Sequence, residues 1–281
     1  VYEKKYSKKK LLKKILKEKL LIIPVVDLNK KVISYLHEDN LKIIKSVKKF
    51  KIPKIPIVIM AGGEGTRLSP FTQVLPKPLI PINSKTALEL IIENYINNNQ
   101  NEFYLSINYK SKIIKAYFNE LNPNYKVTFI EEKKPLGTAG SLFLLKNKIK
   151  DNFIVCNCDI IANFNLSEYY NFHNENNNDI TIMASINSYK IPYGTLNFDR
   201  NNKFIKILEK PDIKNYINIG VYLFSNNILK IIKRNTFLNI TDLINDAQNK
   251  KLKVGVFKIS SKKWKDIGEW DKYYKYIKNN K

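Results

Sequence analysis

Continuous apolar runs alternate with amphipathic segments along the central part of the chain. The run IPIVIMA (55–61) is typical of a strand that is covered on both faces of a sheet. Residues 86–98 follow with apolar residues at helical spacing. The alternation then continues, and it predicts strands at 102–108, 126–131 and 152–159 and helices near 111–120 and 138–147. Strands that alternate with helices predict right-handed βαβ crossovers. We therefore expect an α/β fold, with a Rossmann-like, mostly parallel sheet flanked by helices.

Strands dominate the pattern after residue 180. We predict strands at 180–186, 194–198, 204–209, 217–224 and 253–259, with helices near 226–233 and 241–249.

The first fifty residues have a different organisation. LLKKILKEKLLI (11–22) has the spacing of a helix, and PVVDLNKKVISYL (24–36) predicts two short strands joined at Asn29 and Lys30. KKFKIPKIP (48–56) carries two prolines amid charge and is typical of a linker. We predict two domains, a small αββ unit with its linker at 1–52 and a catalytic unit at 53–281.

Charge and cysteine content narrow the class of partner. The net charge is +24, but lysine is abundant throughout, so we expect small polyanionic substrates and no nucleic-acid partner. Cys156 and Cys158, the only cysteines, have a spacing that suits neither a disulfide framework nor a zinc knuckle. We interpret them as reduced thiols of a cytoplasmic protein. No apolar run approaches the length of a membrane span, so no membrane partner is expected.

A glycine-rich turn follows the first buried strand, within MAGGEGTRLSPFTQVLPKPLIPI (60–82). Ligands of doubly wound sheets bind at the carboxyl ends of strands, and glycines let backbone N–H groups approach an anion closely. The dinucleotide fingerprint G-x-G-x-x-G fails because Leu68 stands at its third glycine, and the P-loop fails because no Gly-Lys pair occurs. Arg67 can make forked bonds to phosphate, and Lys77 is a point charge held between two prolines.

Further motifs follow this turn in a fixed order, namely PLGTAGSL (135–142), NCDI (157–160), EKP (209–211), NIGVYLF (218–224) and WKDIG (264–268). Together they resemble the sugar-1-phosphate nucleotidyltransferases over about residues 55–281. The resemblance implies transfer of a nucleotidyl group from a nucleoside triphosphate to a sugar-1-phosphate, with release of pyrophosphate and with Mg²⁺ as the cofactor.

The resemblance also assigns roles to residues. It implies that Arg67 and Lys77 supply catalytic charge and that Asp159 and Asp266 bind the metal. It implies nucleotide contacts from Ala61, Gly62, Gly63, Gly65, Thr66, Glu132, Gly137 and Thr138, and sugar-phosphate contacts from Tyr193, Gly194, Glu209, Lys210 and Asn218. Two positions depart from the family pattern: Cys158 replaces the glycine of N-G-D, and Ile219 replaces the alanine of N-A-G.

Base preference rests on a carboxylate. Glu132 matches the position that reads the base edge, with Glu131 as the alternative if the alignment slips by one residue. A carboxylate only accepts hydrogen bonds, and guanine presents two adjacent donors, so the chemistry favours GTP over UTP, with CTP third.

The N-terminal stretch LLIIPVVDLNKKVISYL (20–36) resembles the second half of a CBS motif. Bacterial guanylyltransferases that carry CBS motifs and make nucleotide-sugars for surface glycans are similar, which adds to the expectation of a GDP-sugar. Three alternatives stay open. They are a uridylyl- or cytidylyltransferase (acting on a sugar-1-phosphate or phosphocholine), a non-catalytic nucleotide-binding regulator, and a basic nucleic-acid binder. The oligomeric state is also open, including a homo-oligomer.

Overall fold

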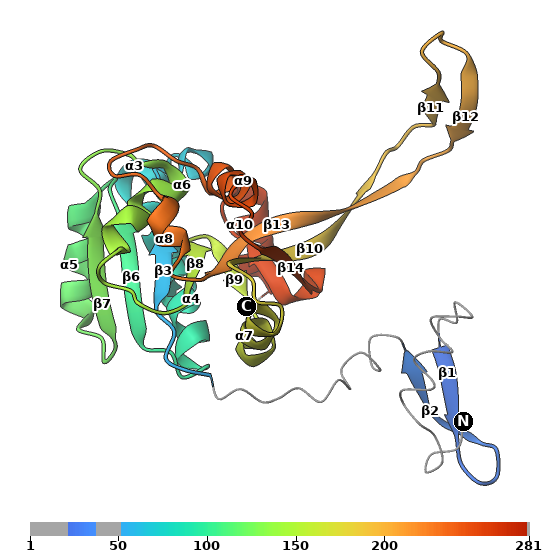
Figure 1. Ribbon diagram of the computed structural model, residues 1–281, viewed down its shortest axis with the longest axis horizontal. Coiled ribbons are helices and arrows are strands. Elements are labelled where there is room, and N and C mark those ends of the chain that lie inside the picture. Colours follow the sequence, from blue (N-terminus) through green and yellow to red (C-terminus); the bar gives the residue numbers. More distant parts are fainter. Residues whose placement is uncertain (1–21, 38–51, 280–281) are drawn as a thin grey trace. The chain divides into compact units, whose positions relative to one another are not determined.

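The computed structural model describes residues 22–37 and 52–279. The chain divides into two compact units, Val1–Phe50 and Lys51–Lys281. In the first unit, β1 (Ile22–Val26) and β2 (Val32–His37) pair antiparallel, which confirms the two predicted strands (Figure 1). The Asp27 carboxylate closes their turn by accepting hydrogen bonds from the N–H groups of Asn29 and Lys31, both at 2.9 Å. The helix predicted at 11–22 lies almost wholly outside the described residues.

A seven-stranded sheet forms the centre of the second unit, in the order β14-β10-β13-β8-β3-β6-β7. Only β13 runs antiparallel to its neighbours in this sheet, so the predicted mostly parallel α/β sheet is confirmed. The strands are β3 (Ile57–Met60), β6 (Glu102–Ile107), β7 (Lys126–Glu131), β8 (Phe153–Asn157), β10 (Ile180–Lys190), β13 (Asp212–Phe224) and β14 (Val254–Ile259).

Helices cover both faces of this sheet (Figure 1). α4 (Ala87–Ile96), α5 (Ser111–Leu121) and α7 (Leu166–Glu175) share one core cluster with the sheet, and α6 (Gly137–Gly140), α8 (Ile228–Ile231) and α9 (Ile240–Asn249) share the other. α3 (Phe71–Val74) belongs to neither cluster, and α10 (Trp270–Asn279) packs in a third cluster. The pattern did not predict α7 or α10. Asn165 caps α7 and its side chain accepts a bond from the Glu168 N–H at 3.2 Å, so an N-cap signature was present in the sequence.

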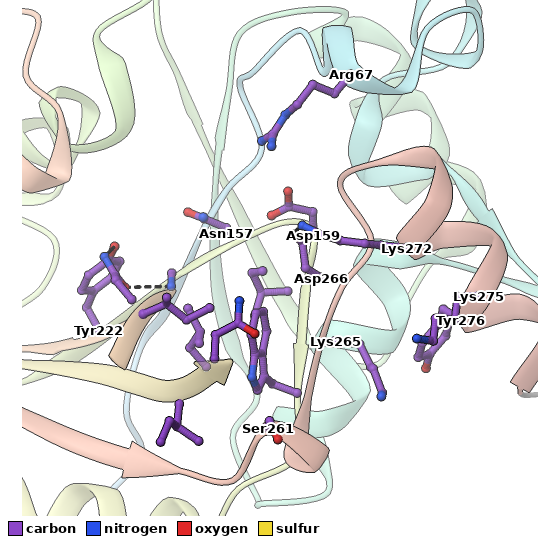
Figure 2. A pocket seen from close by; sticks show the side chains of 18 of the residues that line it. Arg67, Asn157, Asp159, Tyr222, Ser261, Lys265, Asp266, Lys272, Lys275 and Tyr276 are labelled. Carbon is purple, nitrogen blue, oxygen red and sulfur yellow. Dashed lines mark hydrogen bonds and ion pairs between the residues drawn. The ribbon is translucent and has the colours of Figure 1, made fainter. Parts of the chain in front are cut away.

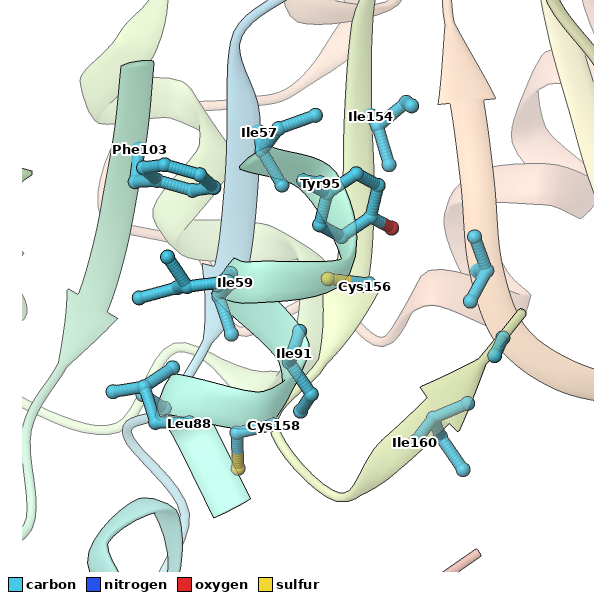
Figure 3. Packing of buried hydrophobic residues seen from close by; sticks show 14 of the residues in the cluster. Ile57, Ile59, Leu88, Ile91, Tyr95, Phe103, Ile154, Cys156, Cys158 and Ile160 are labelled. Atoms are coloured by element: carbon cyan, nitrogen blue, oxygen red, sulfur yellow. The ribbon is translucent and has the colours of Figure 1, made fainter. Parts of the chain in front are cut away.

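The first sheet strand buries both of its faces. Ile57 and Ile59 pack with Leu88 and Ile91 of α4 on one side (Figure 3), whereas Val58 belongs to a second core cluster. A strand that is buried on both faces needs apolar residues at every position, which explains the uninterrupted run. The loop that follows is thereby attached to a buried strand that is paired on both sides, with β8 and β6.

The helix predicted over 138–147 is instead the four-residue α6 followed by a 3-10 segment, Ser141–Leu145. Its first turn is held by another segment, because the N–H groups of Ala139 and Gly140 both donate to the Leu238 carbonyl. A Cβ at Gly137 would lie 2.6 Å from that same oxygen, so the close approach requires glycine.

A two-stranded arm continues β10 and β13 beyond the sheet (Figure 1). Pairing runs without a break in the outer half, from Ala184 opposite Asn218 to Lys190 opposite Asp212. The tip is a second hairpin, made of β11 (Thr195–Phe198) and β12 (Phe204–Leu208). Within the described residues, no helix combines the length and apolar character that crossing a membrane requires.

Candidate active site

The glycine-rich turn closes onto Lys77. Gly65 has φ +68°, which glycine adopts without strain. A Cβ at Gly65 would lie 2.9 Å from the Lys77 Cβ and 2.9 Å from the Thr72 Cγ2. The missing side chain therefore lets the turn approach Lys77 closely. Lys77 lies between Pro76 and Pro78 and starts the 3-10 segment Lys77–Leu79.

A cavity of about 340 Å³ opens beside this turn. It brings together most of the predicted nucleotide-binding residues with three of the four predicted catalytic residues, all except Asp266. Its walls include Gly62, Gly63, Gly65, Arg67, Lys77, Glu132, Gly137, Thr138, Asn157 and Asp159. Ala61 is buried at the end of β3, and Thr66 begins the 3-10 segment Thr66–Leu68; neither lines the cavity, and their nucleotide contacts stay a prediction. The Thr138 hydroxyl accepts a bond from the Ile240 N–H at 2.8 Å, so it also holds the start of α9.

The two glutamates considered for base reading point to different surroundings. Glu132 is 7% exposed and lines the cavity, where its carboxylate accepts bonds from the Ser106 hydroxyl at 2.7 Å and the Leu136 N–H at 2.9 Å. Glu131 instead pairs with Lys115 at 2.6 Å on the exposed surface. Of the two, only Glu132 can meet a ligand in this cavity.

The two predicted metal-binding aspartates converge. Asp159 lies two residues beyond the end of β8, and Asp266 ends β15 (Trp264–Asp266). β15 pairs antiparallel with β9 (Ile160–Ala162), and this register sets Asp266 opposite Ile160, next to Asp159. A carboxylate oxygen of each lies within 3.1 Å of the point that a Cβ at Gly268 would occupy. The absent side chain at Gly268 leaves room between the two acids.

Both aspartates hold ammonium groups. The Lys77 Nζ contacts the Asp159 Oδ2. Burial of Lys77 by itself lowers its pKa, and the charge and hydrogen bond of the Asp159 carboxylate outweigh this effect, so the pKa of the ammonium is raised. The Lys272 Nζ lies 2.6 Å from the Asp266 Oδ2, and this hydrogen bond raises the pKa of Lys272 against the effect of burial.

Oxygen ligands from these two residues fit the preference of Mg²⁺, which is commonly held by one or two carboxylates together with phosphate oxygens and water. The residues that the structure describes contain no cluster of three or more His, Cys, Asp or Glu side chains able to hold a metal alone. The ligand phosphates would therefore have to complete the shell. Cys158 beside Asp159 adds no charge, because burial raises the pKa of its thiol to about 12. Cys156 and Cys158 are both free, in line with the predicted thiols, and both are buried.

A second cavity, of about 550 Å³, also borders Asp159 (Figure 2). It shares Arg67, Asn157 and Asp159 with the first cavity, and Asp266, Asn218 and Lys272 also line it. Asn218 is fixed there, because its Nδ2 donates to the Tyr222 hydroxyl at 2.7 Å and its Oδ1 accepts from the Gly220 N–H at 2.9 Å. Two cavities that meet at one carboxylate can hold two substrates with their reacting groups adjacent.

Four predicted sugar-phosphate residues lie on the arm and line neither cavity. Tyr193 is 74% exposed, and Glu209 and Lys210 lie 4.0 Å apart with only each other as ion-pair partners among the described residues. Gly194 stands beside Glu209. β13 begins at Asp212, six positions from Asn218, so at about 3.3 Å per position the strand alone carries the chain roughly 20 Å from Asn218 before the bend that holds Glu209 and Lys210. Their sugar contacts stay a prediction.

Sequence reasoning missed Lys272 and Glu269. The Glu269 carboxylate forms ion pairs with the Arg67 guanidinium (Nη1 to Oε1, 2.6 Å) and with the Lys272 ammonium (Nζ to Oε2, 3.3 Å). This one acid therefore links the glycine turn to the start of α10. The three-residue spacing of Glu269 and Lys272 was a visible signal, because such spacing places side chains on neighbouring positions at a helix start.

A family model described as nucleotidyl transferase matches residues 57–281. The chain belongs to the nucleotidyl transferase family. This transferase chain is 33% identical over 224 residues to a bifunctional protein GlmU of Methanococcus maripaludis, covering 76% of the chain and 52% of that protein. It is 34% identical over 183 residues to the mannose-1-phosphate guanylyltransferase catalytic subunit beta of Dictyostelium discoideum, covering 63% of the chain and 51% of that subunit. The chain spans about half the length of these curated relatives.

Solved structures share the fold of this transferase chain. HddC from Yersinia pseudotuberculosis superposes with a TM-score of 0.64 at 27% identity, over 81% of this chain and 100% of that one. A second structure of HddC, in complex with GMP-PN, gives a TM-score of 0.63 at the same identity and coverage.

Proposed function

We propose that this chain transfers a nucleotidyl group from a nucleoside triphosphate to a sugar-1-phosphate. The observation that carries the proposal is the meeting of two cavities at Asp159, one beside the glycine turn and the other containing Asn218 and Asp266. Family membership and the names of the relatives, which include a mannose-1-phosphate guanylyltransferase, support the same activity.

The residues around Asp159 suit a displacement at phosphorus. A sugar-phosphate oxygen forms a new bond to the α-phosphorus, and the bond from that phosphorus to the β-phosphate oxygen breaks, releasing pyrophosphate. Such a reaction needs alignment and charge neutralisation more than covalent help. Arg67 borders both cavities and Lys77 the nucleotide side, so their cations would face the phosphates. Mg²⁺ held by Asp159 and Asp266 would supply further positive charge when bound.

We propose GTP as the nucleotide. Glu132 lies in the nucleotide-side cavity as a buried acceptor, and a carboxylate can take the two adjacent donors of guanine. Each carboxylate oxygen has a second lone pair beyond the bonds to Ser106 and Leu136. The guanylyltransferase relatives and the HddC complex with GMP-PN favour the same base.

For the remaining residues and context we propose the following. Tyr193, Gly194, Glu209 and Lys210 contact the sugar phosphate after the arm bends toward the second cavity. The N-terminal unit is a partial CBS motif, and the product is a GDP-sugar for surface glycans, made in the cytoplasm, as in CBS-containing bacterial guanylyltransferases.

A pyrophosphate-release assay tests the activity. The chain is incubated with each of four nucleoside triphosphates against a panel of sugar-1-phosphates and phosphocholine, with Mg²⁺. We expect turnover with GTP and one sugar-1-phosphate. Turnover only with UTP or CTP would refute the base assignment, and nucleotide binding without turnover for any pair would indicate a regulatory protein instead.

A further inference from the structure

Lys272 pairs with one of the two predicted metal-binding carboxylates. Its ammonium reaches from the start of α10 to the Asp266 carboxylate, at 2.6 Å from the Oδ2 (Figure 2). The other oxygen, Oδ1, accepts the Gly268 N–H at 2.8 Å. Both oxygens of this predicted metal ligand are therefore engaged by groups of the chain itself.

We propose that Lys272 is a built-in competitor of the divalent cation, which must displace the ammonium from Asp266, so that Lys272 sets the metal affinity of the site. The proposal rests on the proposed function only in taking Asp159 and Asp266 as the metal ligands.

Electrostatics explains why such a competitor is present. Two carboxylates that border one point repel each other and need positive charge nearby when no metal is bound. Lys77 supplies it at Asp159 and Lys272 supplies it at Asp266. A divalent cation takes over the same role, so the ammonium groups and the metal exclude one another at these oxygens.

The two lysines differ in how easily they can leave. The side chain of Lys77 is 14% exposed, whereas that of Lys272 is 47% exposed. Lys272 also has a second acid within reach, because its Nζ lies 3.3 Å from the Glu269 Oε2. When it leaves Asp266, its ammonium can stay paired with Glu269 and in contact with water. Lys272 is therefore the lysine whose exchange with a metal leaves no buried charge unpaired.

Direct metal binding tests the proposal. Mn²⁺ is titrated into the full chain without nucleotide, and free Mn²⁺ is counted by electron paramagnetic resonance. The proteins are the wild type, Lys272→Gln, Lys272→Met, Asp266→Asn and the control Lys278→Gln. Lys278 is an exposed lysine of the same helix that does not line the second cavity, so its replacement removes the same charge away from Asp266. Thermal melting checks that each variant folds.

We expect both Lys272 variants to bind Mn²⁺ at least fivefold more tightly than the wild type. Lys278→Gln should stay within twofold, and Asp266→Asn should bind more weakly. Equal or weaker Mn²⁺ binding by the Lys272 variants, a gain of the same size in Lys278→Gln, or undiminished binding by Asp266→Asn would each overturn the proposal. The transfer function is judged separately, by the pyrophosphate-release assay. If the Lys272 variants bind Mn²⁺ more tightly but no substrate pair is turned over, the competition by Lys272 is supported and the transferase activity is refuted. If a substrate pair is turned over but the Lys272 variants bind Mn²⁺ as the wild type does, the transferase activity is supported and the competition by Lys272 is refuted.

Discussion

The substitution Gly63→Ala tests whether the glycine turn binds the triphosphate. A Cβ at Gly63 meets no protein atom within 4 Å, and Gly63 is not among the positive-φ residues of the structure. The protein itself therefore tolerates the methyl group. Alanine also reduces the conformational entropy of the unfolded chain, so we expect the free energy of unfolding to rise by about 0.4–1 kcal/mol.

Nucleotide binding should respond in the opposite direction. Gly63 lines the nucleotide-side cavity, so the space that the methyl group enters is the space proposed for the triphosphate. Forcing a methyl group into a filled site costs about 1–3 kcal/mol. That cost corresponds to a loss of roughly 5- to 150-fold in affinity.

The assay pairs calorimetric binding of a non-hydrolysable GTP analogue with thermal melting of the free protein. Gly65→Ala is the contrasting variant, because its φ of +68° and the 2.9 Å approach to Lys77 make the methyl group harmful to the protein itself. The left-handed backbone alone costs about 1–2 kcal/mol with alanine. If Gly63→Ala bound the analogue as tightly as the wild type, the triphosphate would not lie against this turn, and the assignment of the cavity would fail.

Three further predictions concern single side chains. Glu132→Gln should lower the ratio of kcat/KM for GTP to kcat/KM for UTP at least tenfold, because the amide has one acceptor and one donor group in place of two acceptors. An unchanged ratio would show that Glu132 does not read the base. Asp159→Asn should lower kcat at least a hundredfold while the far-ultraviolet circular dichroism spectrum is kept, because the metal ligand is lost; near-wild-type rates would refute the metal assignment. Burial lowers the pKa of His173 from 6.5 to about 4, so the unfolded chain binds the extra proton between these values. Wild-type stability should therefore fall by up to roughly 3 kcal/mol as pH drops from 6.5 to 4. Urea unfolding of His173→Gln should show a flatter profile, and an equally steep one would assign the loss to other groups.

Local patterns in the sequence predicted most of the elements. The run at 55–61 indicated a strand buried on both faces, and helical spacing indicated α4, α5 and α9. These signals are local, because burial on one or both faces imposes a period on the residues of each element. α10 was missed although Trp270, Tyr273, Tyr274 and Ile277 recur there at helical spacing. The signal of α7 is weaker, because its buried residues include the polar Asn171 and His173.

The pattern of apolar and polar residues predicted the positions of single side chains less well. Glu131 and Glu132 are adjacent, and a shift of one residue in an extended segment turns a side chain to the opposite face. The structure directs Glu132 into the cavity and Glu131 to Lys115. No periodicity at this strand end distinguished the two.

The sequence by itself determined the α/β class, the glycine turn and the identity of the charged groups, because each depends on neighbouring residues. The resemblance implied that Asp159 and Asp266 share a metal, and the tertiary structure showed that the pairing of β15 with β9 brings them together. Only the tertiary structure decided that Lys272 pairs with Asp266 and that the arm carries Glu209 away from Asn218. These outcomes depend on the pairing register of strands that are far apart in the chain and on the direction in which an unsupported hairpin leaves the sheet. Such long-range geometry leaves no mark on the local order of residues.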